Sequence, residues 1–164
     1  MQFSVREANL RDYEALCELF AEADSLHSVA LPQVFQTATP PRSREYLAGV
    51  LADERATIFV AEAAGEVVGL VSARVADART IPILVQRRYA FVDDLVVKAR
   101  FRSRGIGRSL MKTAANWAVS KGATSIELDV WEFNQAATTF YESQGYKTIS
   151  RRMDVVLRSS GPPR

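Results

Sequence analysis

Two side chains that dominate covalent catalysis and metal binding are almost absent from this sequence of 164 residues. Cys17 is its single cysteine and His27 its single histidine. One cysteine excludes an intrachain disulfide and a multi-cysteine zinc site, and one histidine excludes metal sites built from several histidines. A single histidine also argues against a Ser-His-Asp triad. Cys17 continues the apolar spacing of Tyr13, Leu16 and Phe20, so we expect it to pack in a helix rather than to react. We expect no metal site.

Long apolar runs and a large net charge are missing as well. No run approaches the roughly 20 residues that a membrane-spanning helix needs, and the first residues carry no signal-peptide stretch. We therefore expect a cytoplasmic protein with no membrane partner. The 21 Lys and Arg residues against 19 Asp and Glu residues leave a formal charge of +2, which is too small to indicate nucleic-acid binding by bulk charge. The apolar residues, 48% of the chain, suffice for a hydrophobic core of ordinary size.

Alternating apolar patterns predict one α/β domain over residues 1–158, followed by a flexible tail over residues 159–164. The segment from Ser25 to Arg42 lacks periodicity and contains three prolines, so it predicts a loop. The expected elements are, in order, a strand at Phe3–Val5, helices around Tyr13–Phe20 and Leu47–Leu51, a hairpin of Ile58–Glu62 and Val67–Val75, a strand at Tyr89–Val97, a helix at Gly105–Val119, a strand at Ile126–Val130, a helix from Asn134 to Gln144, and closing strands at Tyr146–Ile149 and Met153–Arg158.

Charged residues are segregated along the second half of the chain. From Leu95 to Ile126 there are seven bases and no acid, and from Glu127 to Tyr146 there are four acids and no base. The first stretch suits an anion and the second suits a cation. The bases are Lys98, Arg100, Arg102, Arg104, Arg108, Lys112 and Lys121, and the acids are Glu127, Asp129, Glu132 and Glu142.

The stretch Arg102-Ser103-Arg104-Gly105-Ile106-Gly107-Arg108 lies between an expected strand and an expected helix. Glycines at such a junction let the backbone approach a ligand, and the first N–H groups of the helix favour phosphate oxygens. The arginines would add charge-assisted hydrogen bonds. Taken alone, the stretch fits equally well a tight turn with a solvated basic face. It lacks the Gly-x-x-x-x-Gly-Lys-Ser/Thr string of a P-loop, and Leu110 stands where a dinucleotide-binding fingerprint needs its third glycine.

Three segments of the chain resemble the GNAT superfamily of N-acetyltransferases. Arg102, Gly105 and Gly107 match the Arg/Gln-x-x-Gly-x-Gly/Ala loop that follows a strand in that family. Asn134 to Tyr146 resembles its Asn-x-x-Ala-x-x-Phe/Leu-Tyr-x-x-x-Gly-Phe/Tyr segment, and Phe59 to Gly69 resembles its second and third strands. The resemblance covers nearly the whole chain in the family's order. It implies an α/β fold of the α+β type, with a mixed, mostly antiparallel central sheet of about six or seven strands flanked by about four helices.

The resemblance also implies acetyl-CoA (coenzyme A) as the cosubstrate and assigns residues to it. Backbone groups of Leu95, Val96 and Val97, at the end of the fourth strand, would bind the pantetheine arm. Backbone N–H groups of the loop would hold the pyrophosphate, and Asn134, which is also a good helix N-cap, would contact the coenzyme arm. The loop residues are Arg102, Ser103, Arg104, Gly105, Ile106, Gly107 and Arg108.

Acetyl transfer to an amine sets the chemistry that such a site must supply. A free alkyl amine has a pKa of roughly 10.4, so a base must remove a proton before the amine attacks. The leaving thiolate gains from an acid, and no protein nucleophile is needed. Tyr141 matches the family tyrosine that faces the coenzyme sulfur, so the resemblance implies that Tyr141 is the general acid. The other interpretation is an aromatic core residue beside Phe140.

Two adjacent carboxylates, Asp93 and Asp94, interrupt an otherwise apolar strand. Neighbours in a regular strand point to opposite faces, so only one would face a cleft unless a bulge re-aims them. Asp93 matches the position at which family members with two acids place the base or the amine-binding residue. We therefore expect Asp93 to be the base and Asp94 to have a supporting role. The alternative is that both acids are capping groups or are paired near Arg87 and Arg88.

The implied acceptor is an amine, either a small molecule or part of a peptide or protein. The acids from Glu127 and Asp129 onward favour a cationic acceptor, and the apolar residues 81–85 are a candidate contact for a homodimer, which is common in this family. Two other functions stay open: a coenzyme-binding regulatory module without transfer activity, and nucleic-acid binding through the basic stretch. The second is disfavoured because few aromatics interleave with these bases and their helix is amphipathic.

Overall fold

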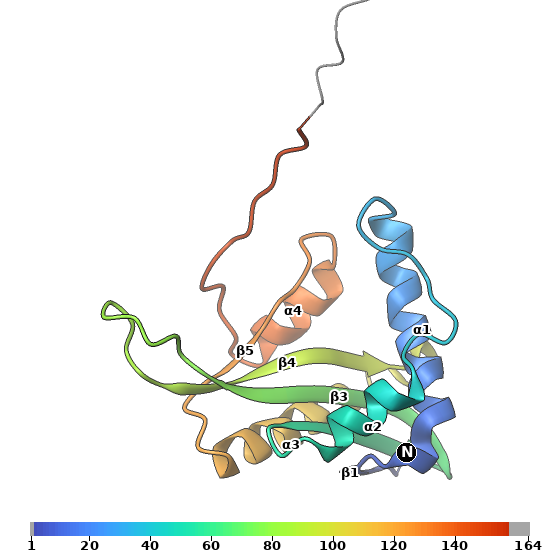
Figure 1. The fold of residues 1–164 in the computed structure, drawn as a ribbon. Coiled ribbons are helices and arrows are strands. Elements are labelled where there is room, and N and C mark those ends of the chain that lie inside the picture. Colours follow the sequence, from blue (N-terminus) through green and yellow to red (C-terminus); the bar gives the residue numbers. More distant parts are fainter. Residues whose placement is uncertain (1, 158–164) are drawn as a thin grey trace, which may run out of the picture. The chain divides into compact units, whose positions relative to one another are not determined.

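The computed structural model describes residues 2–157, which contain a five-stranded sheet and four α-helices (Figure 1). These residues divide into two compact units, with the boundary between Asp129 and Val130. The first unit holds the whole sheet and three of the helices, and the second holds the fourth helix. No helix within residues 2–157 has the length and apolar character that crossing a membrane requires.

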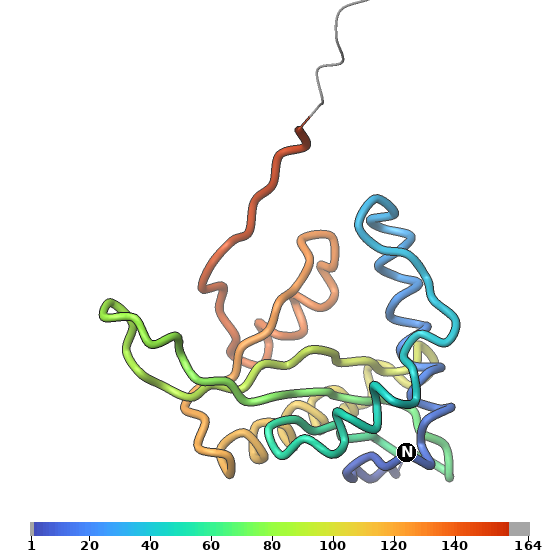
Figure 2. The backbone as a smooth tube through the Cα atoms, viewed as in Figure 1, coloured from blue at the N-terminus to red at the C-terminus, as the bar shows by residue number. Residues whose placement is uncertain are grey.

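The sheet of the first unit has the strands in the order β1-β2-β3-β4-β5. The first three neighbouring pairs are antiparallel, and the last pair, β4 with β5, is parallel. The loop of residues 78–87 between β3 and β4 projects beyond the sheet (Figure 2). The strands are β1 (Ser4–Glu7), β2 (Ala56–Ala63), β3 (Glu66–Asp77), β4 (Arg88–Val97) and β5 (Ile126–Leu128).

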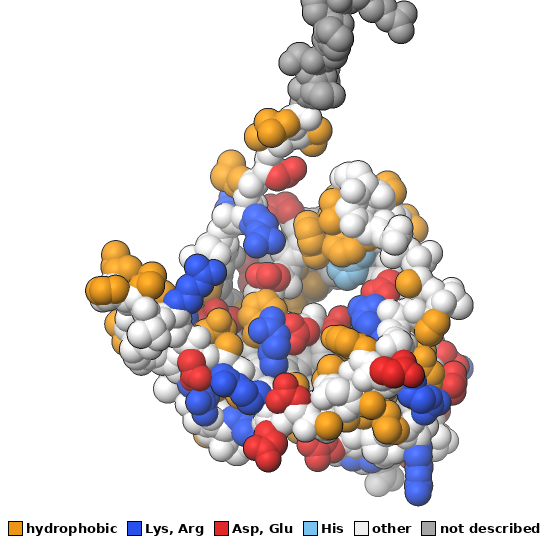
Figure 3. Space-filling model, in the orientation of Figure 1, with side chains coloured by type: hydrophobic (Ala, Val, Ile, Leu, Met, Phe, Trp, Pro, Cys, Tyr) orange, Lys and Arg blue, Asp and Glu red, His pale blue; other side chains and the backbone are white. Residues whose placement is uncertain are grey.

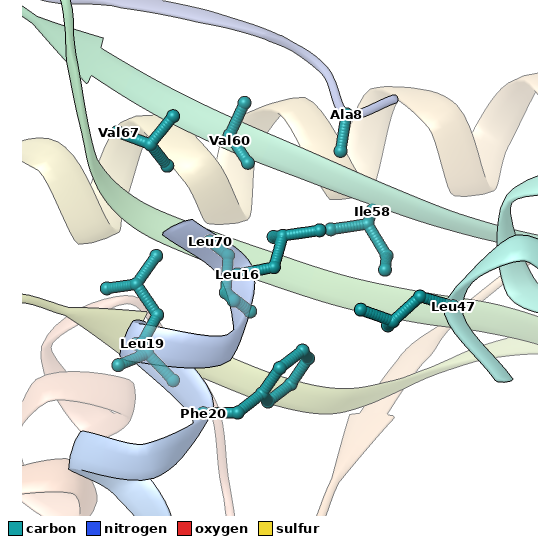
Figure 4. Close-up of a cluster of buried hydrophobic side chains, with 10 residues drawn as sticks. Ala8, Leu16, Leu19, Phe20, Leu47, Ile58, Val60, Val67 and Leu70 are labelled. Atoms are coloured by element: carbon teal, nitrogen blue, oxygen red, sulfur yellow. The ribbon is translucent and has the colours of Figure 1, made fainter. Parts of the chain in front are cut away.

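Helices cover both faces of this sheet. α1 (Tyr13–Ala30) and α2 (Arg44–Ala52) pack on the face that carries Leu70 of β3, as Figure 4 shows. α3 (Ile106–Ser120) packs on the other face, where Ala118 meets Val75 of β3. Leu70 and Val75 are separated by an odd number of positions along a regular stretch of strand, so their side chains point to opposite faces. The larger cluster comprises Ala8, Leu16, Leu19, Phe20, Leu47, Ile58, Val60, Val67, Leu70 and Val96.

The second unit contains α4 (Gln135–Ser143) with both of its expected end signals. The Asn134 side chain accepts a hydrogen bond from the backbone N–H of Ala137 at 3.1 Å, as an N-cap does. Gly145 follows the helix with a φ of 89°, a left-handed conformation that glycine adopts without strain. The Tyr141 ring lies 5.2 Å from that of Phe140 and 5.6 Å from that of Tyr146, measured between centroids.

The sequence predicted the mixed, mostly antiparallel sheet, the hairpin and the four helices correctly, but it misplaced several element ends and added two strands. α1 continues to Ala30, so the loop expected from Ser25 begins only at Leu31. The added turns expose Leu26 and Val29 at 49% and 79%. They extend past the core, so no apolar stripe was needed to make them helical.

Two closing strands were also expected, and residues 146–157 form none, so the described chain has five strands instead of six or seven. An apolar pattern defines a strand only when the backbone finds a pairing partner. The expected fifth strand ends at Leu128 rather than Val130. Arg158 and the tail at 159–164 lie outside the described residues, and the single domain over 1–158 stays a prediction.

Candidate functional site

The edge of β4 that faces β5 is only partly used by the sheet. β5 pairs with β4 from Ala90 to Val92 and then ends, whereas β4 continues to Val97. On its other side β4 stays paired with β3 up to the Val97–Gly69 pair. Within residues 2–157, no strand covers the β5 side of the last part of β4. Such an edge offers backbone N–H and C=O groups to an extended ligand that carries amides.

The expected cofactor residues Leu95, Val96 and Val97 lie along this uncovered part of β4. Val96 is 6% exposed because its side chain joins the core below. The Val96 carbonyl oxygen faces Gly69 of β3, and Lys98, two residues on, donates its N–H to Val68 of β3. The free side of this edge therefore offers the backbone groups of Leu95 and Val97.

The chain then turns into α3 through two residues with left-handed backbone conformation. Ser103 has a φ of 59° and Gly105 has a φ of 81°. Left-handed residues in a turn direct successive N–H groups into one concavity, where they can bind an anion. Gly105 is the N-cap of α3 and has no side chain to bond the first N–H groups of the helix, which are thus open to a ligand. For Ser103 the conformation is costly, and such strain is concentrated at functional sites.

The side chains of this turn have different environments. Ile106 is 1% exposed and anchors the start of α3 in the core. The Arg102 guanidinium turns back onto the protein, because its Nε donates to the Val97 carbonyl oxygen at 2.9 Å. The Arg104 guanidinium lies 5.9 Å from the Phe101 ring centroid. Of the arginines in the expected set, Arg104 and Arg108 flank the N-terminus of α3.

A β-bulge in β4 determines where the two adjacent carboxylates point. Ser72 pairs with Asp94 and Ala73 pairs with Val92, so Asp93 is an extra residue that opposes no partner on β3. Because of this extra residue, both carboxylates line the same pocket rather than opposite faces of the sheet. The β-bulge that both acids would need in order to face one cleft is therefore present.

The pocket is a cavity of about 600 Å³ between α2 and strands β2, β3 and β4. Besides Asp93 and Asp94, its charged lining consists of the acids Glu45 and Asp53 and the bases Arg55 and Arg74. Arg55 is held at 3.0 Å by Asp77, outside the lining. Acids thus outnumber bases in the pocket.

Each carboxylate has a distinct partner. Asp93 accepts from Arg74 at 3.1 Å, and the Arg74 guanidinium lies over the Phe91 ring. Asp94 accepts from the Ser72 hydroxyl at 2.8 Å. Burial raises the pKa of both carboxyl groups above their ordinary value, against the lowering effect of Arg74 on Asp93 and of Ser72 on Asp94. A carboxylate with a raised pKa is a stronger base.

The basic residues suggested as partners of these acids are engaged elsewhere. Arg88 pairs with Asp77 at 2.8 Å and Arg87 pairs with Glu127 at 2.6 Å. Glu127, one of the acids expected to attract a cation, is thus neutralised locally. On the face drawn in Figure 3, Lys and Arg side chains interleave with Asp and Glu and form no single basic patch. No group of three His, Cys, Asp or Glu side chains suited to a metal ion occurs in the part of the chain that the structure describes.

Sequence reasoning missed Ser72 and Arg74, the partners of the two acids. They alternate along β3, with Ser72 directly opposite Asp94. Pairing the predicted hairpin strand with the predicted Tyr89–Val97 strand in register would have found Ser72. The bulge that brings Arg74 to Asp93 leaves no signal in the sequence. Asn134 lies at the start of α4 and Tyr141 lies within the helix, as expected.

Comparison with known proteins gives a consistent family. The sequence model of the Acetyltransferase (GNAT) family matches residues 13–146. An uncharacterized N-acetyltransferase from Archaeoglobus fulgidus is 32% identical over 101 residues, which are 62% of this chain and 67% of that protein. The uncharacterized N-acetyltransferase YhfO from Bacillus subtilis is 24% identical over 144 residues, which are 88% of this chain and 89% of that protein. A mutant of the BH1408 protein from Bacillus halodurans has the same fold, with a TM-score of 0.90, 24% identity, and coverage of 94% of this chain and 99% of that one.

Proposed function

The chain belongs to the Acetyltransferase (GNAT) family and is an acetyltransferase, and we propose that it transfers the acetyl group of acetyl-CoA directly to an amine in a ternary complex. The observation that carries the proposal is the uncovered edge of β4, which leads directly into the left-handed turn before α3. The coenzyme presents an extended arm with two amides and an anionic pyrophosphate. A free strand edge fits the first feature, and a helix N-terminus fits the second.

The chain's contribution to binding is mainly backbone. Leu95 and Val97 would hydrogen-bond the pantetheine amides, and the N–H groups from Ser103 to Arg108 would hold the pyrophosphate. Arg104 and Arg108 would add charge-assisted contacts. Asn134 is proposed to contact the coenzyme arm, on the strength of its position in the family segment. Acetyl-CoA supplies an activated thioester, and no metal is required.

Proton movement needs a base and an acid. We assign the base to Asp93, whose raised pKa suits the removal of a proton from an ammonium group, directly or through water. The neutral amine nitrogen then bonds to the acetyl carbon and gives up its second proton, the bond from that carbon to sulfur breaks, and the thiolate takes a proton. Tyr141 is assigned as the donor of that proton. Cys17 is 9% exposed and needs no role.

The pocket beside the bulge favours a cationic acceptor. Glu45, Asp53 and Asp94 form no ion pair among residues 2–157, and each lines the cavity. An ammonium group entering here gains Coulomb attraction before the proton is removed. The cavity volume suits a small molecule or a single side chain.

Homodimer formation and a cytoplasmic location also remain proposals. Ile83 and Val85, in the projecting loop between β3 and β4, are 86% and 79% exposed. Exposed apolar side chains of this size are candidates for contact with a second copy. Light scattering after gel filtration measures the mass, and a monomer that persists at high concentration contradicts the dimer.

The proposed function is tested by two measurements on the full chain. Calorimetry with acetyl-CoA should show binding, and a thiol-release screen with small amines, polyamines and peptides should show turnover with cationic amines. Binding with no thiol release from any acceptor would instead support the coenzyme-binding regulatory module. No binding at millimolar acetyl-CoA would overturn both functions.

A further inference from the structure

Helix α1 contacts the segment that leads into the anion-binding turn through one carboxylate. The Glu22 Oε1 atom accepts from the backbone N–H of Ala99 at 3.1 Å and from Arg102 Nη2 at 2.7 Å. The same guanidinium donates from Nε to the Val97 carbonyl oxygen. Glu22 therefore ties together the end of β4, the short 3-10 turn Ala99–Phe101 and the residue just before Ser103.

These bonds change the role of Arg102. Two N–H groups of its guanidinium are directed at protein oxygens, one on a side chain and one on the backbone. Arg102 is thus oriented toward the protein, and the backbone amides that follow it are left to meet the anion. The next residue, Ser103, is held in its costly left-handed conformation. Such a conformation persists only where its surroundings determine it.

We propose that Glu22 is a positioning residue for the coenzyme, a role that rests on the proposed function. By holding Ala99 and Arg102, Glu22 presets the turn from Ser103 to Arg108 in the conformation that binds a diphosphate. A turn that is already ordered loses less conformational entropy when the ligand binds, and this increases affinity without any contact between Glu22 and the ligand.

The chain offers a matched control one helical turn earlier. Glu18 lies on the same helix and pairs with Lys98 at 3.0 Å. Lys98 is also held by Glu66 at 2.9 Å, so removal of Glu18 leaves this base paired. Glu18 is 66% exposed and has no bond to Ala99 or Arg102. Glu18→Ala therefore removes the same kind of side chain from α1 without releasing the turn.

The test is the dissociation constant of coenzyme A, measured by calorimetry with folded variants. Glu22→Ala should raise this constant about five- to tenfold, which is the size expected for one charge-assisted hydrogen-bonding group. Glu18→Ala should change it less than twofold. Glu22→Gln keeps an oxygen acceptor for Ala99 and should restore most of the affinity. If Glu22→Ala does not fold, Arg102→Ala, which removes the other member of the pair, should show the same loss.

A double-mutant cycle with Arg102→Ala tests whether the two side chains act as one unit. The double variant should bind coenzyme A about as weakly as either single variant. Transfer rates from S-acetylpantetheine, which lacks the diphosphate, should be unaffected by Glu22→Ala, whereas a general structural defect lowers the rates with both donors.

Three results would overturn the inference. Unchanged affinity in Glu22→Ala shows that the turn needs no such support. Tighter binding shows that Arg102, once released, contacts the diphosphate itself. Equal losses with both acetyl donors show a structural role only. In each case the wild-type chain still binds coenzyme A, so the proposed function survives, whereas a wild-type chain that does not bind it removes both.

Discussion

Gly69→Ala should create a steric clash with the part of β4 that is proposed to hold the coenzyme arm. Gly69 lies on β3 opposite Val97. An added Cβ would stand 2.9 Å from the Val96 carbonyl oxygen and 3.3 Å from both Leu110 Cδ1 and Val97 Cγ2. The nearest of these atoms belongs to the backbone, so it cannot move aside alone. Overpacking of this kind costs about 1–3 kcal/mol, and the lower chain entropy of alanine returns about 0.5–1 kcal/mol.

The expected net effect of Gly69→Ala is a loss of about 1 kcal/mol in the free energy of unfolding. Urea denaturation measures it as a lower midpoint at an unchanged slope. Gly49→Ala is the matched control, because among the described residues no atom outside its own helix lies within 4 Å of the added Cβ. In the interior of α2, that change should increase stability by about 0.5–1 kcal/mol.

The same two variants separate a local effect on the site from a general one. A shifted Val96 carbonyl should also weaken coenzyme A binding in Gly69→Ala when the protein is fully folded, whereas Gly49→Ala should leave this affinity unchanged. If Gly69→Ala unfolds at the same urea concentration as wild type, β3 does not approach the Val96 carbonyl closely enough to exclude a Cβ, and the reasoning is refuted.

Four further outcomes are expected. Tyr141→Phe should lower kcat at least tenfold with little change in coenzyme affinity, whereas Tyr146→Phe, which removes the hydroxyl of the neighbouring ring, should not; equal rates in wild type and Tyr141→Phe would remove Tyr141 as the acid. Asp93→Asn should lower the rate at neutral pH and recover part of it at high pH, where more of the amine is already neutral; an unchanged pH–rate profile would remove Asp93 as the base. Burial raises the pKa of Asp94 above its ordinary value of 3.8, so the native state loses stability as the pH rises through that raised pKa. The melting temperature of Asp94→Asn, measured relative to that of wild type, should therefore increase from pH 4 to 7, and a constant difference contradicts this. The Arg6 guanidinium lowers the pKa of Asp12, so their pair stabilises the fold at neutral pH and is lost as the pH falls through that lowered value; Asp12→Ala should cost about 2 kcal/mol at pH 7 and less in acid.

Features encoded by neighbours in sequence were predicted well. The β2–β3 hairpin follows from two apolar runs around Gly65, and α4 follows from Asn134 at its start and Gly145 at its end. Each signal lies within a few residues of the structure it determines. The turn before α3 belongs to the same group, because Gly105 allows the left-handed conformation that starts the helix.

Features that depend on a distant partner were not predictable in the same way. The face on which Asp93 lies depends on one extra residue in β4 relative to β3, and the sequence of β4 alone does not contain that register. The closing strands failed for a related reason. Their apolar residues are present, but Ile149 and Val155 are each 78% exposed, and no ladder forms along residues 146–157. Alternation of apolar and polar residues predicts which side chains of a paired strand face inward, but it does not show whether the strand has a neighbour to pair with.

The basic stretch gives the clearest example of how distant partners change an electrostatic argument. Seven bases without an acid suggested a surface prepared for an anion, yet the first three are neutralised by carboxylates 32 to 80 residues away. The pairs are Lys98 with Glu18 and Glu66, Arg100 with Glu66, and Arg102 with Glu22. Arg104 and Arg108 are the bases of this stretch that lie next to the start of α3. We therefore expect anion binding at this site to depend on the geometry of one turn, which Glu22 is proposed to fix, more than on the number of bases around it.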